Sequence, residues 1–245
     1  MIFKQLIIET ETVIEKGWIQ SLFNGTGGLG ITLEKMLNIP TNQFEIPDYN
    51  NIEIKTKLNN KQGYISLFNA TPDSFLFEIK RIQQTYGYPD AQCPQYKVFN
   101  ISVYANRKVY IGKNLFATLK IDNDLKKVYL LILDSNYNVI DCNTSWSFGL
   151  LFEKINRKLK NLFLVFGEKK TINKITYYKY LKYKCYRFKN FNTFLRSLEK
   201  GEIRISFKIG VIKKGEKKGR LCDHGTSFDI NVNNLASIYH EIITR

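Results

Sequence analysis

The tightest condition on the fold comes from one stretch in the first quarter of the chain, Pro47-Asp48-Tyr49-Asn50-Asn51-Ile52-Glu53-Ile54-Lys55. Side chains alternate faces along a β-strand, so Glu53 and Lys55 share one face with their Cα atoms roughly 6.6 Å apart. The intervening isoleucines then point into a core. A turn at Asn50-Asn51, preceded by a proline that disfavours helix, lets Asp48 approach Glu53 from a neighbouring segment. The stretch therefore predicts a strand that carries two carboxylates and an ammonium.

This trio suits metal-assisted hydrolysis of a phosphodiester. Mg²⁺ prefers oxygen ligands, so we expect Asp48 and Glu53 to bind it, with the Ile54 carbonyl completing the shell. Lys55 would orient or deprotonate the attacking water, or neutralise charge at phosphorus. The alternative is that Asp48 is a turn residue and that Glu53 and Lys55 form the solvated face of an amphipathic strand. The pattern Asp-x4-Glu-x-Lys is short enough to occur by chance.

Residues 25–37 add a further acid. Leucine and methionine recur there at helical spacing and leave Glu34 beside the apolar face. A helix starting near Leu29 would bring Glu34 beside the strand as an outer acid of the site. The same residues spell G-x-G-x-x-G, a pattern found in nucleotide-binding loops. The segment before them is typical of an amphipathic helix, whereas a dinucleotide-binding unit requires a buried strand there.

The charge balance is compatible with a polyanionic partner. Lys and Arg number 37 against 22 Asp and Glu, a net charge of +15, which attracts nucleic acid. A compositional bias of the genome explains the total equally well. The distribution is more informative, because acids gather at 9–15 and 34–48 and bases at 157–160, 169–189 and 213–220. In residues 177–194 aromatic and basic side chains interleave, as expected either of a backbone-binding surface or of a half-solvated hairpin.

The C-terminal part supplies groups suited to reading DNA. Arg220 and Lys208 can donate to guanine, Asp223 can accept from cytosine, and His224 can donate to a base acceptor. Four further lysines are better suited to phosphates: Lys213, Lys214, Lys217 and Lys218. The alternatives are a solvated lysine loop beside two glycines, and a turn in which Asp223 caps the backbone.

Several segments, taken together, resemble the MvaI/BcnI family of Type II restriction endonucleases, which has the MutH-like form of the PD-(D/E)xK nuclease fold. The resemblance covers nearly the whole chain and includes Trp146-Ser147-Phe148 followed by a Lys-rich helix. The chain has Ser206-Phe207-Lys208 where the family tends to place an Asp-x-Arg pair. The other matching segments are Gly27–Gly30 leading to Glu34, Pro47-Asp48, Ile52–Thr56, Ser66–Phe68 and Lys217–Phe228.

The resemblance implies an Mg²⁺-dependent endonuclease that cuts double-stranded DNA at a short C/G-rich site of the CC-x-GG kind. It also implies a monomer that cuts the two strands in succession, with a DNA methyltransferase as its genetic partner. Two other functions stay open: a MutH-like nicking enzyme of mismatch repair, which would share the four site residues, and a non-enzymatic basic nucleic-acid-binding module.

The fold class expected is mixed α+β, a PD-(D/E)xK core with a central mixed sheet flanked by helices and two lobes around a DNA cleft. The 245 residues form one endonuclease domain, with a catalytic lobe about 1–165 and a recognition lobe about 166–245. Four scattered cysteines and the lack of a long apolar run favour a cytoplasmic protein without disulfides, zinc or membrane spans. Helices are expected near 4–19, 29–38, 74–86, 148–160, 191–200 and 232–240. Strands are expected near 44–47, 52–57, 63–69, 98–104, 107–112, 115–121, 127–134, 137–142, 161–167, 175–187, 203–212 and 226–231.

Overall fold

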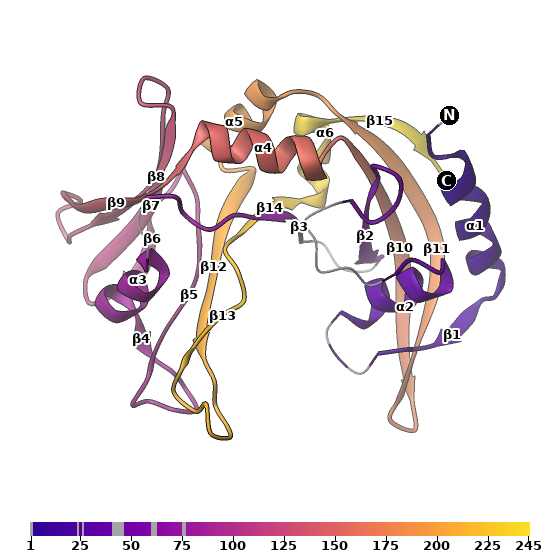
Figure 1. Cartoon of the computed structure of the whole chain (residues 1–245), viewed down its shortest axis with the longest axis horizontal. Helices are drawn as coiled ribbons and strands as arrows, with labels where there is room; N and C mark the ends of the chain where they lie inside the picture. The colour runs from indigo at the N-terminus through magenta and orange to yellow at the C-terminus, as the bar shows by residue number, and fades with distance from the viewer. Residues whose placement is uncertain (1, 24, 26, 41–46, 60–62, 75–76) are drawn as a thin grey trace. The chain divides into compact units, whose positions relative to one another are not determined.

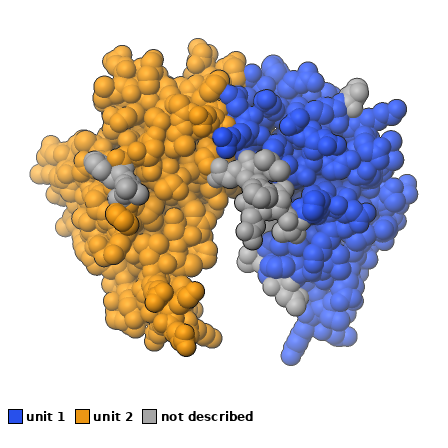
Figure 2. Space-filling model, in the orientation of Figure 1, with its two compact units in different colours: residues 1–65, 155–189, 238–245 blue, residues 66–154, 190–237 orange. Residues whose placement is uncertain are grey.

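The computed structural model describes residues 2–23, 25, 27–40, 47–59, 63–74 and 77–245. The chain forms two compact units (Figures 1 and 2), each assembled from separated stretches of sequence. Unit 1 comprises residues 1–65, 155–189 and 238–245, and unit 2 comprises residues 66–154 and 190–237. The lobe boundary expected near residue 165 falls inside β10 (Asn161–Ile172), a strand of unit 1.

The class is mixed α+β, as the sequence predicts. The helices are α1 (Lys4–Glu15), α2 (Gly28–Met36), α3 (Glu78–Tyr86), α4 (Phe148–Lys158), α5 (Phe191–Glu199), the 3₁₀ turn η1 (Val232–Asn234) and α6 (Leu235–Ile238). The strands are β1 (Trp18–Gln20), β2 (Glu53–Leu58), β3 (Tyr64–Asn69), β4 (Tyr88–Pro89), β5 (Lys97–Val103), β6 (Val109–Gly112), β7 (Leu115–Asp122), β8 (Lys127–Leu133), β9 (Val139–Ser147), β10, β11 (Ile175–Phe188), β12 (Ile203–Val211), β13 (Leu221–Asp223), β14 (Ser227–Asn231) and β15 (Tyr239–Thr244). No described helix is long and apolar enough to cross a membrane.

The differences from the sequence-based expectation lie at segments that pair with distant strands. The first helix ends at Glu15, because Gly17 has a φ of +68° and β1 follows it to pair with β11. The expected helix 232–240 is short, because Tyr239 and the residues after it join the sheet as β15. Most of the expected strand 44–47, and part of the expected helix 74–86, lie outside the described residues.

Unit 1 is built on a five-stranded sheet in the order β1-β11-β10-β2, with β15 also paired to β11. β2 lies at one end of this order and runs parallel to β10, with Ile54 opposite Phe163. Helices α1 and α2 bury one face of the sheet, where Leu6 and Leu33 pack with these two residues in one apolar cluster. The long antiparallel strands β10 and β11 lie at the centre of this sheet (Figure 1).

Unit 2 contains a six-stranded sheet in the order β3-β14-β12-β5-β4, with β13 paired to β12, and a four-stranded sheet in the order β6-β7-β8-β9. Its core is rich in aromatic rings. Trp146 is fully buried, and its ring lies 5.8 Å from that of Phe228 and 6.1 Å from that of Phe207. The indole N–H of Trp146 donates to the Ala70 carbonyl at 2.9 Å, which satisfies the one polar atom of that ring.

Candidate active site

A tight turn brings Asp48 back beside β2. Tyr49 and Ile52 exchange both backbone hydrogen bonds, at 3.0 and 2.7 Å, and the two asparagines between them have φ values of +42° and +66°. Asparagine tolerates this left-handed conformation better than most residues. Residues directly opposite each other on an antiparallel pair point to the same face. With Tyr49 opposite Ile52, the next pair outward is Asp48 and Glu53.

Asp48 also bonds directly to the strand. Its Oδ2 atom accepts a hydrogen bond from the Ile54 N–H at 2.8 Å. This N–H therefore points to the edge of β2 that faces away from β10, and the N–H and C=O of one strand residue point to the same edge. The Ile54 carbonyl consequently lies on the Asp48 side of β2. Within the described residues, Asp48 Oδ1 makes no hydrogen bond.

Two lysines hold the Glu53 carboxylate. Lys55 Nζ lies 2.6 Å from Oε1, and Lys158 Nζ, at the end of α4, lies 3.3 Å from Oε2. The side chain of Glu53 is only 5% exposed, so these ion pairs are shielded from bulk water. The hydroxyl of Tyr239 is buried without a hydrogen-bond partner among the described residues. Burial raises the pKa of Tyr239, and the charge of Glu53 raises it further.

Glu34 lies close enough to this group to sense its charges. Burial raises the pKa of Glu34, Asp48 and Glu53 raise it further, and Lys55 opposes them. Three carboxylates and one lysine from α2, the turn and β2 thus share one electrostatic environment. The structure brings together all four residues that the sequence analysis selected as catalytic.

Glycines allow α2 to approach the sheet closely. A Cβ atom on Gly30 would stand 3.4 Å from Thr56 Oγ1 on β2 and 3.9 Å from Glu34 Oε1. A Cβ atom on Gly28 would stand only 2.5 Å from the Tyr178 hydroxyl on β11. The glycine-rich segment therefore serves helix packing. It follows α1 and the antiparallel strand β1, so it is not the strand-to-helix turn of a dinucleotide-binding unit.

A cavity of about 570 Å³ in unit 1 is lined by residues of α2, β2, β10 and β11. Glu34, Ile54 and Lys55 line it, and so do two further cations, Lys57 and Lys169. A cavity bordered by one acid and three lysines, next to Asp48 and Glu53 whose charges act on Glu34, offers places for a cation and for the phosphates around it.

The donor set fits a hard divalent cation. Asp48 and Glu53 supply carboxylate oxygens on one face of the hairpin. The Ile54 carbonyl points to the edge of β2 that lies beside Asp48. Among the described residues, no three carboxylate, imidazole or thiol groups converge on one metal position. Two carboxylates and the carbonyl would therefore hold the cation, and Glu34 would act from outside that set.

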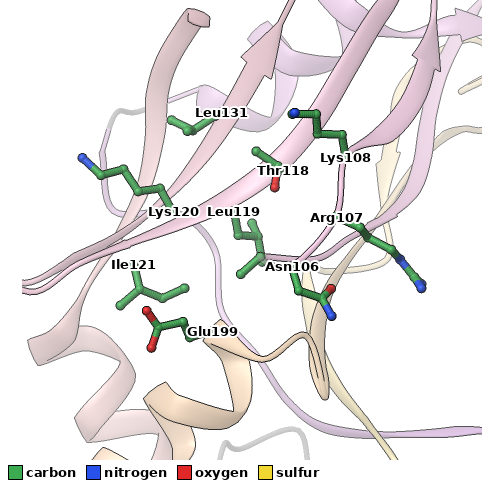
Figure 3. A pocket seen from close by; sticks show the side chains of 10 residues that line it. Asn106, Arg107, Lys108, Thr118, Leu119, Lys120, Ile121, Leu131 and Glu199 are labelled. Atoms are coloured by element: carbon green, nitrogen blue, oxygen red, sulfur yellow. The ribbon is translucent and has the colours of Figure 1, made fainter. Parts of the chain in front are cut away.

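A cavity of different character lies in unit 2, with a volume of about 610 Å³ (Figure 3). Its basic side chains point in different directions, and several are already engaged. The Arg107 guanidinium lies 3.6 Å from the centre of the Tyr104 ring, and Lys120 Nζ lies 3.0 Å from Asp122 Oδ2. Among the described lining residues Glu199 is the one carboxylate, as Glu34 is in the cavity of unit 1, so the cavities differ in the Asp48 and Glu53 charges that act on Glu34.

The eight residues predicted to bind DNA, Asp223 among them, all lie in unit 2. Lys208 is exposed on β12, and the others follow on the exposed segment 213–224. Lys213 forms an ion pair with Asp90 at 3.1 Å. Asp223 Oδ1 accepts from the Gly225 N–H at 2.9 Å, and His224 Nε2 lies 3.5 Å from Cys222 Sγ. Lys214, Lys217, Lys218 and Arg220 are also exposed.

Three neighbours of the site were not predicted from the sequence: Lys158, Tyr239 and Lys169. Lys158 belongs to the Lys-rich helix that was expected, but its contact with Glu53 spans 105 residues of sequence. That contact depends on the parallel pairing of β2 with β10, which directly follows the helix. No local pattern distinguishes Lys158 from its basic neighbours.

The chain matches a protein family in sequence and is similar to solved structures. The sequence model of the MvaI/BcnI restriction endonuclease family matches residues 7–239. The solved structure "Restriction endonuclease MvaI-cognate DNA substrate complex" is similar with a TM-score of 0.91 and 28% identity, over 98% of this chain and 97% of that chain. "Restriction endonuclease MvaI in the absence of DNA" is similar with a TM-score of 0.63 and 27% identity, over 98% and 96% of the two chains. None of the curated proteins compared with this chain matches it.

Proposed function

Because the chain belongs to the MvaI/BcnI restriction endonuclease family, we propose how its own residues cut DNA and which DNA they select. The family match and the structural similarity confirm the resemblance seen in the sequence: the protein is a Type II restriction endonuclease, a site-specific DNA nuclease. The catalytic centre proposed is the cluster of Glu34, Asp48, Glu53 and Lys55 in unit 1. The observation that carries this assignment is the hairpin register that sets Asp48 opposite Glu53.

Each residue of the cluster has a distinct proposed role. Asp48 and Glu53 bind the cation together with the Ile54 carbonyl, and the Ile54 N–H fixes the orientation of the Asp48 carboxylate. Lys55 orients the attacking water or takes its proton, and its ammonium opposes charge that builds up on the phosphate. Glu34, whose pKa is raised, accepts a hydrogen bond or a proton at the margin of the site.

The cation proposed is Mg²⁺. When bound, it lowers the pKa of a water molecule and stabilises negative charge on the scissile phosphate. The support for it is the oxygen-only donor set and the cluster of carboxylates that repel one another without a cation.

Recognition of the DNA sequence is assigned to unit 2. Arg220 and Lys208 would donate to guanine, and Asp223 and His224 would contact the other base edges, while Lys213, Lys214, Lys217 and Lys218 hold phosphates. The support is the exposure of this segment. The substrate proposed is a short double-stranded site of the CC-x-GG kind. The protein would act as a cytoplasmic monomer, cut the strands in succession, and be accompanied genetically by a DNA methyltransferase.

Run-off sequencing of plasmid cut in Mg²⁺ tests this proposal. We expect linear product with both strands cut inside one short C/G-rich site, and no cleavage in EDTA. Lys55→Ala should lower single-turnover cleavage at least about 100-fold, the usual contribution of one proton-transfer group, while retaining cognate binding in EDTA. Undiminished cutting by Lys55→Ala would contradict its role, and an unrelated run-off sequence would contradict the substrate.

A further inference from the structure

The strands β10 and β11 continue beyond their neighbours in the sheet of unit 1. The last residue of β2, Leu58, is paired with Gly167, and β1 reaches only as far as Tyr177. Residues 168–172 of β10 therefore have only β11 as a described strand partner, and residues 175–176 of β11 have only β10. A turn at Asn173-Lys174, with φ values of +50° and +66°, joins the two strands. Five residues beyond Gly167 extend about 16 Å, and Figure 1 shows the projecting hairpin. We call residues 168–176 the arm.

The tip of the arm exposes apolar surface. Ile172 and Ile175 pair across the strands beside the turn, and they are 51% and 41% exposed. Alternation places them on the same face as Tyr177 and Trp18. Exposure of this isoleucine pair to water is unfavourable, so its burial against a partner would be favourable. This exposed pair is available to pack against a partner.

The arm and the adjoining residues of β11 carry a net positive charge, which favours an anionic partner. Residues 168–179 carry four lysines, Lys169, Lys170, Lys174 and Lys179, and one carboxylate, Glu168, which is paired across the strands with Lys179. Lys170 lies with Nζ 4.2 Å from the centre of the Trp18 ring, which keeps its ammonium at the surface beside the aromatic face.

The opposite face of the arm leads into the catalytic cavity. Lys169 and Tyr178, one of the cross-strand pairs of this hairpin, both line the cavity that contains Glu34 and Lys55. A polyanion held at the reacting residues would therefore meet Lys169 at the root of the arm. This continuity within one unit identifies the anionic partner as the DNA substrate itself.

We propose that the arm enters a groove of the DNA duplex next to the scissile phosphate. Lys169 and Lys174 contact phosphates on the two sides of the groove, while Ile172 and Ile175 pack against sugars and base edges between them. Two-stranded ribbons are narrow enough for such a fit, and apolar side chains at a tip are a known way to contact the groove floor. The proposal rests on the nuclease function proposed above and adds a second DNA-contacting element, carried by the catalytic unit.

Binding of a fluorescein-labelled cognate duplex in EDTA, measured at several salt concentrations, tests the lysines. Lys169→Gln/Lys174→Gln should weaken binding roughly 10- to 50-fold and lower the slope of log Kd against log salt by nearly two, since each phosphate contact releases about one counterion. Cognate and unrelated duplexes should be affected alike. The control is Lys4→Gln, an exposed lysine on α1. A double variant with the affinity and slope of this control overturns the proposal.

The apolar tip is tested separately. Ile172→Ser/Ile175→Ser should weaken binding about fivefold with an unchanged salt slope, because it removes apolar contact and no charge. Ile8→Ser on α1 is the matched control, since Ile8 is also 51% exposed. Equal binding by the tip variant and this control overturns the groove contact. Cleavage by the wild-type protein in Mg²⁺ keeps the outcomes apart: absence of cutting contradicts the proposed function, whereas cutting with unaffected arm variants contradicts the arm alone.

Discussion

Lys158 Nζ lies 3.3 Å from Glu53 Oε2, on the carboxylate whose other oxygen accepts a hydrogen bond from Lys55 at 2.6 Å. The two lysines reach Glu53 from different segments, β2 and the end of α4. Their charges balance the buried carboxylate when no cation is bound, and they fix its orientation. We therefore expect Lys158 to act as a positioning residue through Glu53.

Lys158→Gln should lower single-turnover cleavage roughly 10-fold, as loss of a group that orients a metal-binding side chain commonly does. It should also lower the Mg²⁺ concentration for half-maximal cleavage, because one repelling charge beside Glu53 is gone. Rates measured across a Mg²⁺ series give both quantities. Arg157→Gln is the control, an exposed cation one residue away. A Lys158→Gln enzyme indistinguishable from this control would contradict the role.

Glu34 gives a prediction about pH. Burial and the charges of Asp48 and Glu53 raise its pKa, with Lys55 opposing. A carboxyl group whose pKa is raised by folding contributes stability below its unfolded value of about 4.5, and this stability is lost as pH rises through the raised pKa. Glu34→Gln should therefore raise the melting temperature near pH 7, with little gain near pH 4.

Thermal unfolding in EDTA at the two pH values measures this difference. Glu15→Gln is the control, because Glu15 is exposed on α1. The idea fails if Glu34→Gln changes the melting temperature equally at both pH values, since the effect would then not come from ionisation. Cleavage by Glu34→Gln should fall as well, in line with the proposed role of this acid.

The local parts of the site follow from sequence. Strand alternation and the Asn50-Asn51 turn predict that Asp48 and Glu53 meet, and helical spacing predicts α2 with Glu34 on it. Most of the expected helices and strands are present for the same reason.

The parts that sequence did not predict depend on pairing between distant segments. β15 forms because Tyr239 and the residues after it pair with β11 more than fifty residues earlier in the chain. Lys158 meets Glu53 because Leu162, four residues after it, is opposite Glu53 in the β2–β10 register. The two units alternate along the sequence for the same reason, since the chain returns to unit 1 at residues 155 and 238 and then adds β10 and β15 to its sheet. Register between distant strands has no local signature.

Arg81 should be critical for the stability of unit 2. Its guanidinium bridges two buried carboxylates, Glu78 with a 1% exposed side chain and Asp141 with a 5% exposed one. Arg81→Met leaves both charges without their cation, which should cost roughly 3 kcal/mol of unfolding free energy. Urea unfolding followed by circular dichroism measures the loss. Lys120→Met breaks the exposed Lys120–Asp122 pair and should change little; equal losses in both variants would contradict the argument.

Gly28 should be intolerant of even a methyl group, because an added Cβ would lie 2.5 Å from the Tyr178 hydroxyl and 3.1 Å from its ring. Tyr178 is 4% exposed and cannot swing away freely, so Gly28→Ala should destabilise the protein by about 1–3 kcal/mol. Gly149→Ala is the control: its Cβ meets nothing closer than 4.0 Å, and alanine favours helix. Adding Tyr178→Phe to Gly28→Ala removes the closest contact and should restore part of the loss, which thermal melts of the single and double variants can measure. If Gly28→Ala melts like the wild type, α2 does not depend on this close approach to β11, and the explanation of the glycine-rich segment as a packing device is wrong.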